Sequence, residues 1–368
     1  MAEKKEIQIM KAETLKRIIT VLTDSTANNV FSPALLYYTI AGLSRITDGD
    51  TKAELLSALS ETDEGAADCL AQFSKDLYCP GTSDLGIAIF ADESAGMKNE
   101  QIKELTARYG LDFTVGKMGT GRMNRLVTAW INGKTNAFLK KQLDIKTYSD
   151  ELFRLVSAIY LKSSWTSVFT ESKTEDFYVS AGKKVSCEMM RGRETAFYLK
   201  GENYSAASKM LENGYEMIFV LPDEGTELSD IAKKEEVLNI LLNDRNSGIE
   251  CRLIDMSLPK FDVSCKNSLD DSLKTLGIEA IFDFDRADFS PISEAEKIGV
   301  SHTQQISRIK VDEEGIEGAS YIEVSIVYGS LIASEPFRFI IDRPFMFSVI
   351  NRKNMPLFVG TVTDPTQR

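Results

Sequence analysis

The segment that begins at residue 316 constrains the fold more than any other, because its residues alternate in a strict period of two as far as residue 326. One side of the extended chain would carry Ile316, Gly318, Ser320, Ile322, Val324 and Ile326, and the other side Glu317, Ala319, Tyr321, Glu323 and Ser325. That period is typical of a half-buried β-strand. The pattern breaks at residues 328–330 and ends at the Ser-Glu-Pro of residues 334–336.

A second apolar run follows at residue 337 and is interrupted by the Asp-Arg-Pro of residues 342–344. Its apolar residues, Phe339, Ile341, Phe345, Phe347 and Val349, predict core strands. Periodicity alone would also permit a hairpin of two ordinary strands joined by a long turn.

The rest of the chain predicts helices first and mixed strands later. Helical patterns cover residues 7–22, 99–109 and 121–140, another helix opens at Pro33, and Thr51 and Glu54 have the spacing of a capping box that starts a helix. Strand patterns cover residues 86–91, 155–161, 185–198, 215–221 and 249–258, with short helices near 228–243 and 267–276. This order, without regular βαβ alternation, predicts an α+β fold. No repeat or Pro/Gly-rich linker marks a boundary, so we expect one domain over residues 1–368.

The charge balance limits the possible partners. A formal net charge of −12 without a basic stripe argues against nucleic acid and against a heparin site. No apolar run approaches the roughly 20 residues that a membrane span needs.

Five cysteines, without a Cys-x-x-Cys pair, predict free thiols and no metal site. The first residues resemble a charged helix and not a secretory signal, so either the protein stays inside the cell or a signal has been removed.

Catalytic motifs are missing from the sequence. A Ser-His-Asp site would have to use the single histidine, His302, and no Gly-x-Ser-x-Gly turn or glycine-rich phosphate loop accompanies it. The acidic run at residues 312–314 lacks the ligand spacing of a calcium loop, and we expect a solvated acidic turn there. The sequence therefore predicts a protein that is not an enzyme and needs no cofactor.

An ordered set of motifs resembles the serpins, a family of serine protease inhibitors, in its prokaryotic form. The matching stretches are residues 29–33, 155–160 with Lys162 and Trp165, 189–190, 216–222, 258–261, 273–277, 288–290, 311–320, 342–347 and 356–365. The resemblance implies a serpin fold with about nine helices, three β-sheets and an exposed reactive-centre loop at about residues 313–336.

The resemblance also implies a mechanism in which the chemistry belongs to the partner. A serine protease, or alternatively a cysteine protease, would attack the loop and form an acyl-enzyme. The cut loop would then insert into the main sheet and carry the covalently bound protease with it. Fourteen residues from 316 to 329 span about 45 Å at about 3.3 Å per residue. We expect a monomer, secreted as many serpins are; the alternative is a cytoplasmic protein.

The family's hinge corresponds to Glu313, Gly315, Ile316, Gly318, Ala319 and Ser320. Ile316 departs from the small hydroxyl residue that usually follows the hinge glycine, and Gly318 replaces the usual alanine. No proline lies between residues 315 and 330, so nothing in this run removes a donor from a strand ladder.

The region that lets the family's main sheet open corresponds to Ser32, Leu35, Ser157, Trp165 and Gln305. Leu35, Ser157 and Gln305 stand where a serine, an asparagine and a histidine are common. Because several partners change together, we expect an altered opening region and not a defective one.

Counting seventeen residues along the loop, as the family does from its acidic hinge residue, places the cut between Gly329 and Ser330. Val327, Tyr328 and Leu331 remain alternative sites because glycine offers a protease pocket no side chain. Residues 326–333 contain no Arg or Lys, which favours elastase-, chymotrypsin- or subtilisin-like targets. The alternative function is that of a non-inhibitory serpin that acts as a binding or structural protein.

Overall fold

A computed structural model describes residues 10–79, 81–244, 250–295, 297–300, 303–317 and 336–367. The reactive-centre loop positions Gly318, Ala319, Ser320, Val327, Tyr328, Gly329, Ser330 and Leu331 lie outside these residues, as does His302. The described chain forms two compact units, one of Met1–Val21, Pro33–Tyr160 and Lys266–Ile306, the other of Leu22–Ser32, Leu161–Cys265 and Ser307–Arg368.

The first unit is mainly helical. Its helices are α1 (Ala12–Leu22), α2 (Pro33–Leu43), α3 (Gly49–Leu59), α4 (Asp63–Leu77), α5 (Asn99–Tyr109), α6 (Gly121–Lys134) and α9 (Asp270–Thr275). They accompany a three-stranded sheet in the order β3 (Asp112–Val115), β2 (Ser83–Ala91) and β4 (Phe153–Leu161).

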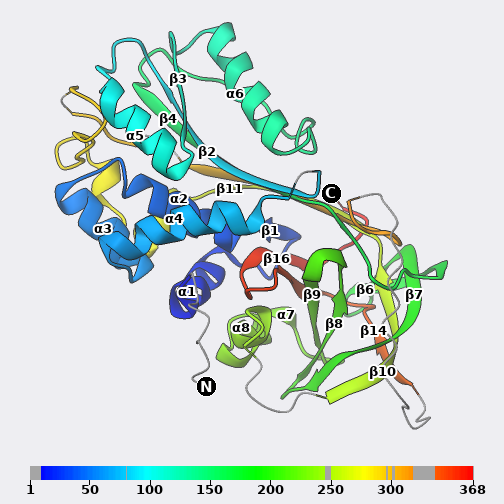
Figure 1. The fold of residues 1–368 in the computed structure, drawn as a ribbon. Helices are drawn as coiled ribbons and strands as arrows, with labels where there is room; N and C mark the ends of the chain where they lie inside the picture. The colour runs from blue at the N-terminus through cyan, green and yellow to red at the C-terminus, as the bar shows by residue number, and fades with distance from the viewer. Residues whose placement is uncertain are drawn as a thin grey trace, which may run out of the picture. The chain divides into compact units, whose positions relative to one another are not determined.

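Strand β2 is buried on both faces, so its sequence is almost continuously apolar. On one face Phe90 packs with Met123 and Val127 of α6, and Figure 1 shows α6 beside this sheet. On the other face Ile87 lies so close to Gly42 of α2 that a side chain there would collide with it. This packing explains why α2 is apolar around most of its circumference.

The second unit is mainly strands (Figure 1). Its large sheet has the order β1 (Asn29–Phe31), β16 (Pro356–Val362), β15 (Phe345–Ile350), β9 (Glu216–Pro222), β8 (Tyr204–Met210), β7 (Lys183–Lys200), β10 (Glu250–Pro259) and β14 (Phe337–Ile340), with β6 (Glu171–Ser180) also paired to β7. The short helices α7 (Leu228–Ile231) and α8 (Glu235–Leu241) accompany β9. Phe345 and Phe347 are fully buried and contact the ring of Phe261.

A third sheet has the order β11 (Phe261–Ser268), β12 (Gln304–Val311), β13 (Gly315–Ile316) and β5 (Ser163–Ser164). Strand β5 follows β4 in the chain after a break at Lys162. This small sheet contains the start of the alternating segment.

The fold class is confirmed, because the described residues contain nine α-helices and three sheets in an α+β arrangement. The predicted core strands at the C-terminus are also correct, since Phe339, Ile341, Phe345, Phe347 and Val349 are all buried. None of the five cysteines, all of which lie in the described residues, forms a disulfide. None of the described helices is long and apolar enough to cross a membrane. The expectation of one domain stays a prediction.

Several boundaries were wrong. Helix α6 ends at Lys134 and not at 140, because Asn136 and Ala137 adopt left-handed backbone angles that stop the helical hydrogen bonds. The capping box does not form. Helix α3 begins two residues before Thr51, and the Glu54 carboxylate instead accepts hydrogen bonds from the backbone N–H groups of Glu279 and Ala280, at 2.7 and 2.6 Å.

The other differences concern where elements begin or divide. The first helix begins at residue 12, since residues 10 and 11 are not helical. The short helices expected near 228–243 are α7 and α8, separated by residues 232–234, whereas β11 continues to Ser268 where a short helix was expected from about 267.

Candidate functional site

The alternating segment begins in a tight turn at residues 312–317, here called the hinge turn. Strand β12 ends at Val311, and the chain then reverses so that Ile316 pairs antiparallel with Val311. Gly315 and Ile316 also pair antiparallel with Ser164 and Ser163 of β5. The backbone N–H of Asp312 donates to the Gly315 carbonyl at 3.1 Å. The first residues of the segment are therefore already a strand between β12 and β5.

Gly315 occupies a position that only glycine fits. Its φ of +155° is one that residues with side chains rarely adopt, and a Cβ atom there would lie 2.6 Å from the Ser164 Cα. The backbone angle by itself favours glycine, which has no Cβ atom. Close approach to β5 is the additional reason, and only the structure shows it.

Ile316, the residue that departs from the family pattern, is buried. Its side chain is 3% exposed, although the residues that follow it are charged or small. Burying an aliphatic side chain of this size is worth about 1.5–3 kcal/mol. The departure therefore holds the hinge turn in the sheet.

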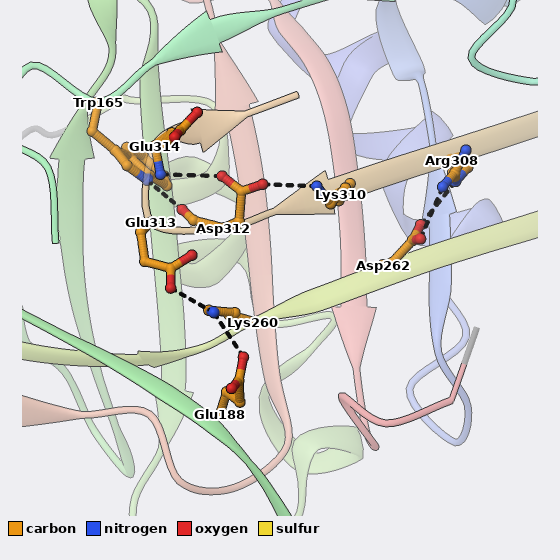
Figure 2. A network of polar contacts seen from close by, with 9 residues as sticks. All are labelled: Trp165, Glu188, Lys260, Asp262, Arg308, Lys310, Asp312, Glu313 and Glu314. Atoms are coloured by element: carbon orange, nitrogen blue, oxygen red, sulfur yellow. Dashed lines mark hydrogen bonds and ion pairs between the residues drawn. The ribbon is translucent and has the colours of Figure 1, made fainter. Parts of the chain in front are cut away.

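Two aromatic residues hold the backbone of the hinge turn. The Trp165 indole N–H donates to the Asp312 carbonyl at 2.9 Å, and its backbone N–H donates to the Glu314 carbonyl at 2.9 Å. The backbone N–H of Phe169 donates to the Glu313 carbonyl at 3.4 Å. Three consecutive carbonyl groups are thus bound by one short stretch of chain, and Figure 2 shows Trp165 beside Asp312 and Glu314.

Ion pairs hold the side chains of the same turn (Figure 2). The Lys260 ammonium lies 2.5 Å from the Glu313 carboxylate and 2.7 Å from that of Glu188. Lys310 pairs with Asp312 at 2.8 Å. Asp312 and Glu313 of the expected acidic turn are partly exposed, and each is paired with a lysine: Lys310 of β12 itself, and Lys260 between β10 and β11.

The pKa values at the hinge turn follow from these contacts. Partial burial alone would raise the pKa of Glu313, but the hydrogen bond and the positive charge of Lys260 outweigh it, so this pKa lies below its ordinary value. Burial likewise would lower the pKa of Lys260, but its hydrogen bonds to Glu188 and Glu313 raise it. The pair is therefore fully ionised at neutral pH.

Near the end of β12, Arg308 and Asp262 form a bidentate pair with both distances at 2.8 Å (Figure 2). The hydrogen bond to Asp262 raises the pKa of Arg308. This pair ties β12 to β11 just before the hinge turn, and two-pronged guanidinium pairs are among the more rigid side-chain contacts.

Of the residues expected in the sheet-opening region, Leu35 and Ser157 are linked through Thr39. The Ser157 hydroxyl lies 2.8 Å from the Thr39 hydroxyl, and Thr39 also donates to the Leu35 carbonyl at 2.7 Å. Thr39 was missed by sequence reasoning. It occupies the one position of α2 that is not fully buried, and a lone threonine in an apolar helix carries no distinct signal. Ser32 and Gln305 are both buried, and each has partners.

Sequence reasoning also missed Phe169 and Lys209. Lys209 stands near the end of β8, where a sequence reader expects a solvated lysine, yet its side chain is 1% exposed. Only the pairing of distant strands buries it.

Comparison with known proteins defines the family. The family model described as serpin (serine protease inhibitor) matches residues 14–365. An alpha-1-antitrypsin-like protein of Tamias sibiricus is 30% identical over 94% of this chain and 84% of its own length. Antichymotrypsin-2 of Bombyx mori is 28% identical over 84% of each chain. The protein belongs to the serpin family.

The fold agrees with that assignment. The native-state crystal structure of tengpin, a thermophilic serpin, superposes with a TM-score of 0.84 at 24% identity, covering 99% of this chain and 95% of that one. Relatives named as protease inhibitors are consistent with a protein that does not itself catalyse a reaction.

Proposed function

We propose that this serpin is a suicide-substrate inhibitor of serine proteases. The observation that supports it most is the start of the alternating segment, which is already paired as a strand between β12 and β5. This strand ends at Ile316, since Glu317 has a φ of +38°, so insertion would require Glu317 to become extended before the residues after it could pair in turn.

The register of that strand allows the proposal to be tested residue by residue. Because Ile316 pairs with Val311, a continued antiparallel ladder would bring Gly318 opposite Ile309, Ser320 opposite Ser307 and Ile322 opposite Gln305. The β12 residues in this series alternate with more exposed ones, and all of them are buried. Small or apolar loop residues would therefore meet the buried face of β12, as cross-strand pairs share one face of a sheet.

The other face has complementary charge. The same register places Glu317 opposite Lys310, and Ala319 opposite Arg308. The acidic residue at the start of the inserting strand would therefore meet a basic residue of β12, which supports this register over one shifted by a single residue.

The chemical step would belong to the protease. Its nucleophilic serine oxygen would attack the carbonyl carbon of Gly329, forming an ester while the bond to the Ser330 nitrogen breaks and that nitrogen takes up the proton from the protease's base. Insertion of the cut loop would then displace the bound protease. Distortion of its oxyanion hole would stop hydrolysis of the ester, since that step depends on close positioning.

We infer elastase-, chymotrypsin- or subtilisin-like targets, since residues 326–333 offer apolar side chains and no Arg or Lys. A relative named antichymotrypsin supports this class. The cut is proposed at Gly329-Ser330, with Val327, Tyr328 and Leu331 as the neighbouring alternatives.

The test is to incubate the protein with elastase and with chymotrypsin, look for a complex that survives boiling in detergent, and sequence the released C-terminal peptide. Wild type should form the complex, and its melting temperature should rise after loop cleavage. Ser320→Arg should be cleaved without forming a complex, because the register places this side chain on the buried face. Tyr321→Arg, on the opposite face, is the matched control and should still form it.

Cleavage of wild type by every protease tried, with neither a complex nor a rise in melting temperature, would contradict the proposal. It would leave the non-inhibitory binding function, because the loop would then not insert.

A further inference from the structure

A buried ion pair in the same compact unit as the hinge turn has no part in the mechanism proposed above. Lys209, on β8, contacts the carboxylate of Glu194 on β7, and their side chains are only 1% and 11% exposed. Removing both charges from water is expensive, and a hydrophobic pair of similar size often serves stability equally well. The pair therefore calls for an explanation other than stability.

The Lys209 ammonium faces two aromatic rings. Its nitrogen lies 4.4 Å from the ring centre of Phe169 and 5.5 Å from that of Trp165. The two rings contact each other edge to face, with centres 5.9 Å apart and an angle of 87° between their planes. A cation over an aromatic face is most strongly attracted when both are shielded from water, as they are here.

These rings belong to the two residues whose N–H groups hold the hinge turn. Trp165 binds the Asp312 and Glu314 carbonyls, and Phe169 binds that of Glu313. One continuous series of contacts therefore runs from Glu194 through Lys209 and the aromatic pair to the hinge backbone. All of its members lie in the same compact unit.

We propose that Lys209 and Glu194 are positioning residues for the hinge turn. The carboxylate of Glu194 holds the ammonium of Lys209 in place, and the ammonium holds the rings of Trp165 and Phe169. The Trp165 indole N–H and the backbone N–H groups of both residues thereby stay against the hinge carbonyls. The pair thereby keeps the hinge turn closed before the loop is cut. Its effect on inhibition depends on the proposed function, whereas its effect on the hinge turn does not.

The desolvation of the pair supports this assignment. Burial raises the pKa of Glu194 and lowers that of Lys209, and the attraction between them only partly offsets burial. Burial thus opposes the charged form of each group, as expected for two side chains shielded from water.

The experiment uses the full chain with Lys209→Met and Glu194→Leu combined, which replaces the ion pair by apolar side chains and should preserve the melting temperature. Hydrogen exchange is followed in the peptide that spans residues 311–317. We expect exchange there to become faster by on the order of tenfold, because losing a shielded cation–aromatic contact would make opening of the turn easier by about that factor. If the ion pair only stabilised the fold, its replacement would change hydrogen exchange throughout the unit and not specifically at residues 311–317. The size of that change would follow the change in melting temperature.

A second readout uses the fluorescence of Trp165. The chain has two tryptophans, so Trp130→Phe leaves Trp165 as the single emitter. Acrylamide should quench Trp165 more strongly in the double variant than in its parent. Arg193→Met is the matched control, because Arg193 neighbours Glu194 in β7 but pairs with Asp255 on the exposed face. It should change neither readout.

The proposal would be overturned if, in a double variant that keeps its melting temperature, hinge exchange equals that of wild type and Trp165 quenching equals that of the Trp130→Phe parent. If the double variant does not fold, Glu194→Gln provides the same test, since it removes the counter-charge with little change of shape. If wild type forms no covalent complex with any protease, the proposed function fails, while hinge exchange still decides the role of Lys209.

Discussion

Replacing Ile316 by serine should release the hinge turn, because the burial of this one side chain opposes release. Ile316 is 3% exposed and lies between Val311 and Ser163 in the ladder. Opening the hinge turn would expose the Ile316 side chain to water, which costs free energy. Ile316→Ser removes most of that cost and so makes opening easier. Full burial of such a side chain is worth about 1.5–3 kcal/mol. A serine hydroxyl without a partner at that position would weaken the closed state further.

A loss of about 2–3 kcal/mol corresponds to a shift in the opening equilibrium of about 30- to 150-fold, since each 1.4 kcal/mol is a factor of ten. Hydrogen exchange of the peptide spanning residues 311–317 measures that equilibrium directly. Exchange in peptides from β9 and β15 should not change, because these strands do not contact the hinge turn in the ladder.

Ile340→Ser is the control for a general effect of losing an isoleucine. Ile340 is 39% exposed on β14, so the same substitution there should alter exchange at the hinge turn by less than about twofold. Unchanged exchange in Ile316→Ser would refute the reasoning, since it would mean that burial of Ile316 does not hold the turn.

Two further predictions concern the same turn. Gly315→Ala should weaken the closed hinge by roughly 1–3 kcal/mol, because Gly315 has a φ of +155° and lies close to Ser164. The same hydrogen-exchange measurement tests this. Gly182→Ala is the control: Gly182 also has a positive φ but open space around it, so this variant should leave the hinge unaffected. The second prediction is a dependence on pH. The pKa of Glu313 is lowered by Lys260, so the stabilisation is present above the ordinary glutamate pKa of about 4.3 and is lost as pH falls through the lowered value. The difference in melting temperature between wild type and Glu313→Gln should therefore be constant from about pH 8 to about 5 and close at lower pH. A difference that persists unchanged into acid would count against the ion pair.

Much of this protein could be predicted from local patterns. Apolar periodicity identified the C-terminal core strands, because strand and helix periods are properties of neighbouring residues. The strand that alternation predicts from Ile316 onward stays a prediction, since it lies mostly outside the described residues. The order of helices and strands was sufficient for the fold class. The family resemblance identified Gly315 as the hinge glycine, but its backbone angle and its close approach to β5 became visible only in the structure.

Contacts between distant parts of the chain could not be predicted in this way. Glu313 reads as a solvated charge until the chain after β10 brings Lys260 beside it, and Lys209 reads as a surface lysine until the strands around it bury it. The capping box at Thr51 and Glu54 failed for the same reason, because residues more than two hundred positions away supplied better partners for the carboxylate.

Local patterns in the sequence were enough to assign most strands and helices and to recognise the family, and they predict a loop that could become a strand. Only the folded chain shows how the hinge turn is held: by the burial of Ile316, the backbone bonds from Trp165 and the lysine beside Glu313. The physical reason is that periodicity and backbone preference act between neighbours. Burial, ion pairing and the pKa shifts that follow depend on which distant residues share one desolvated space.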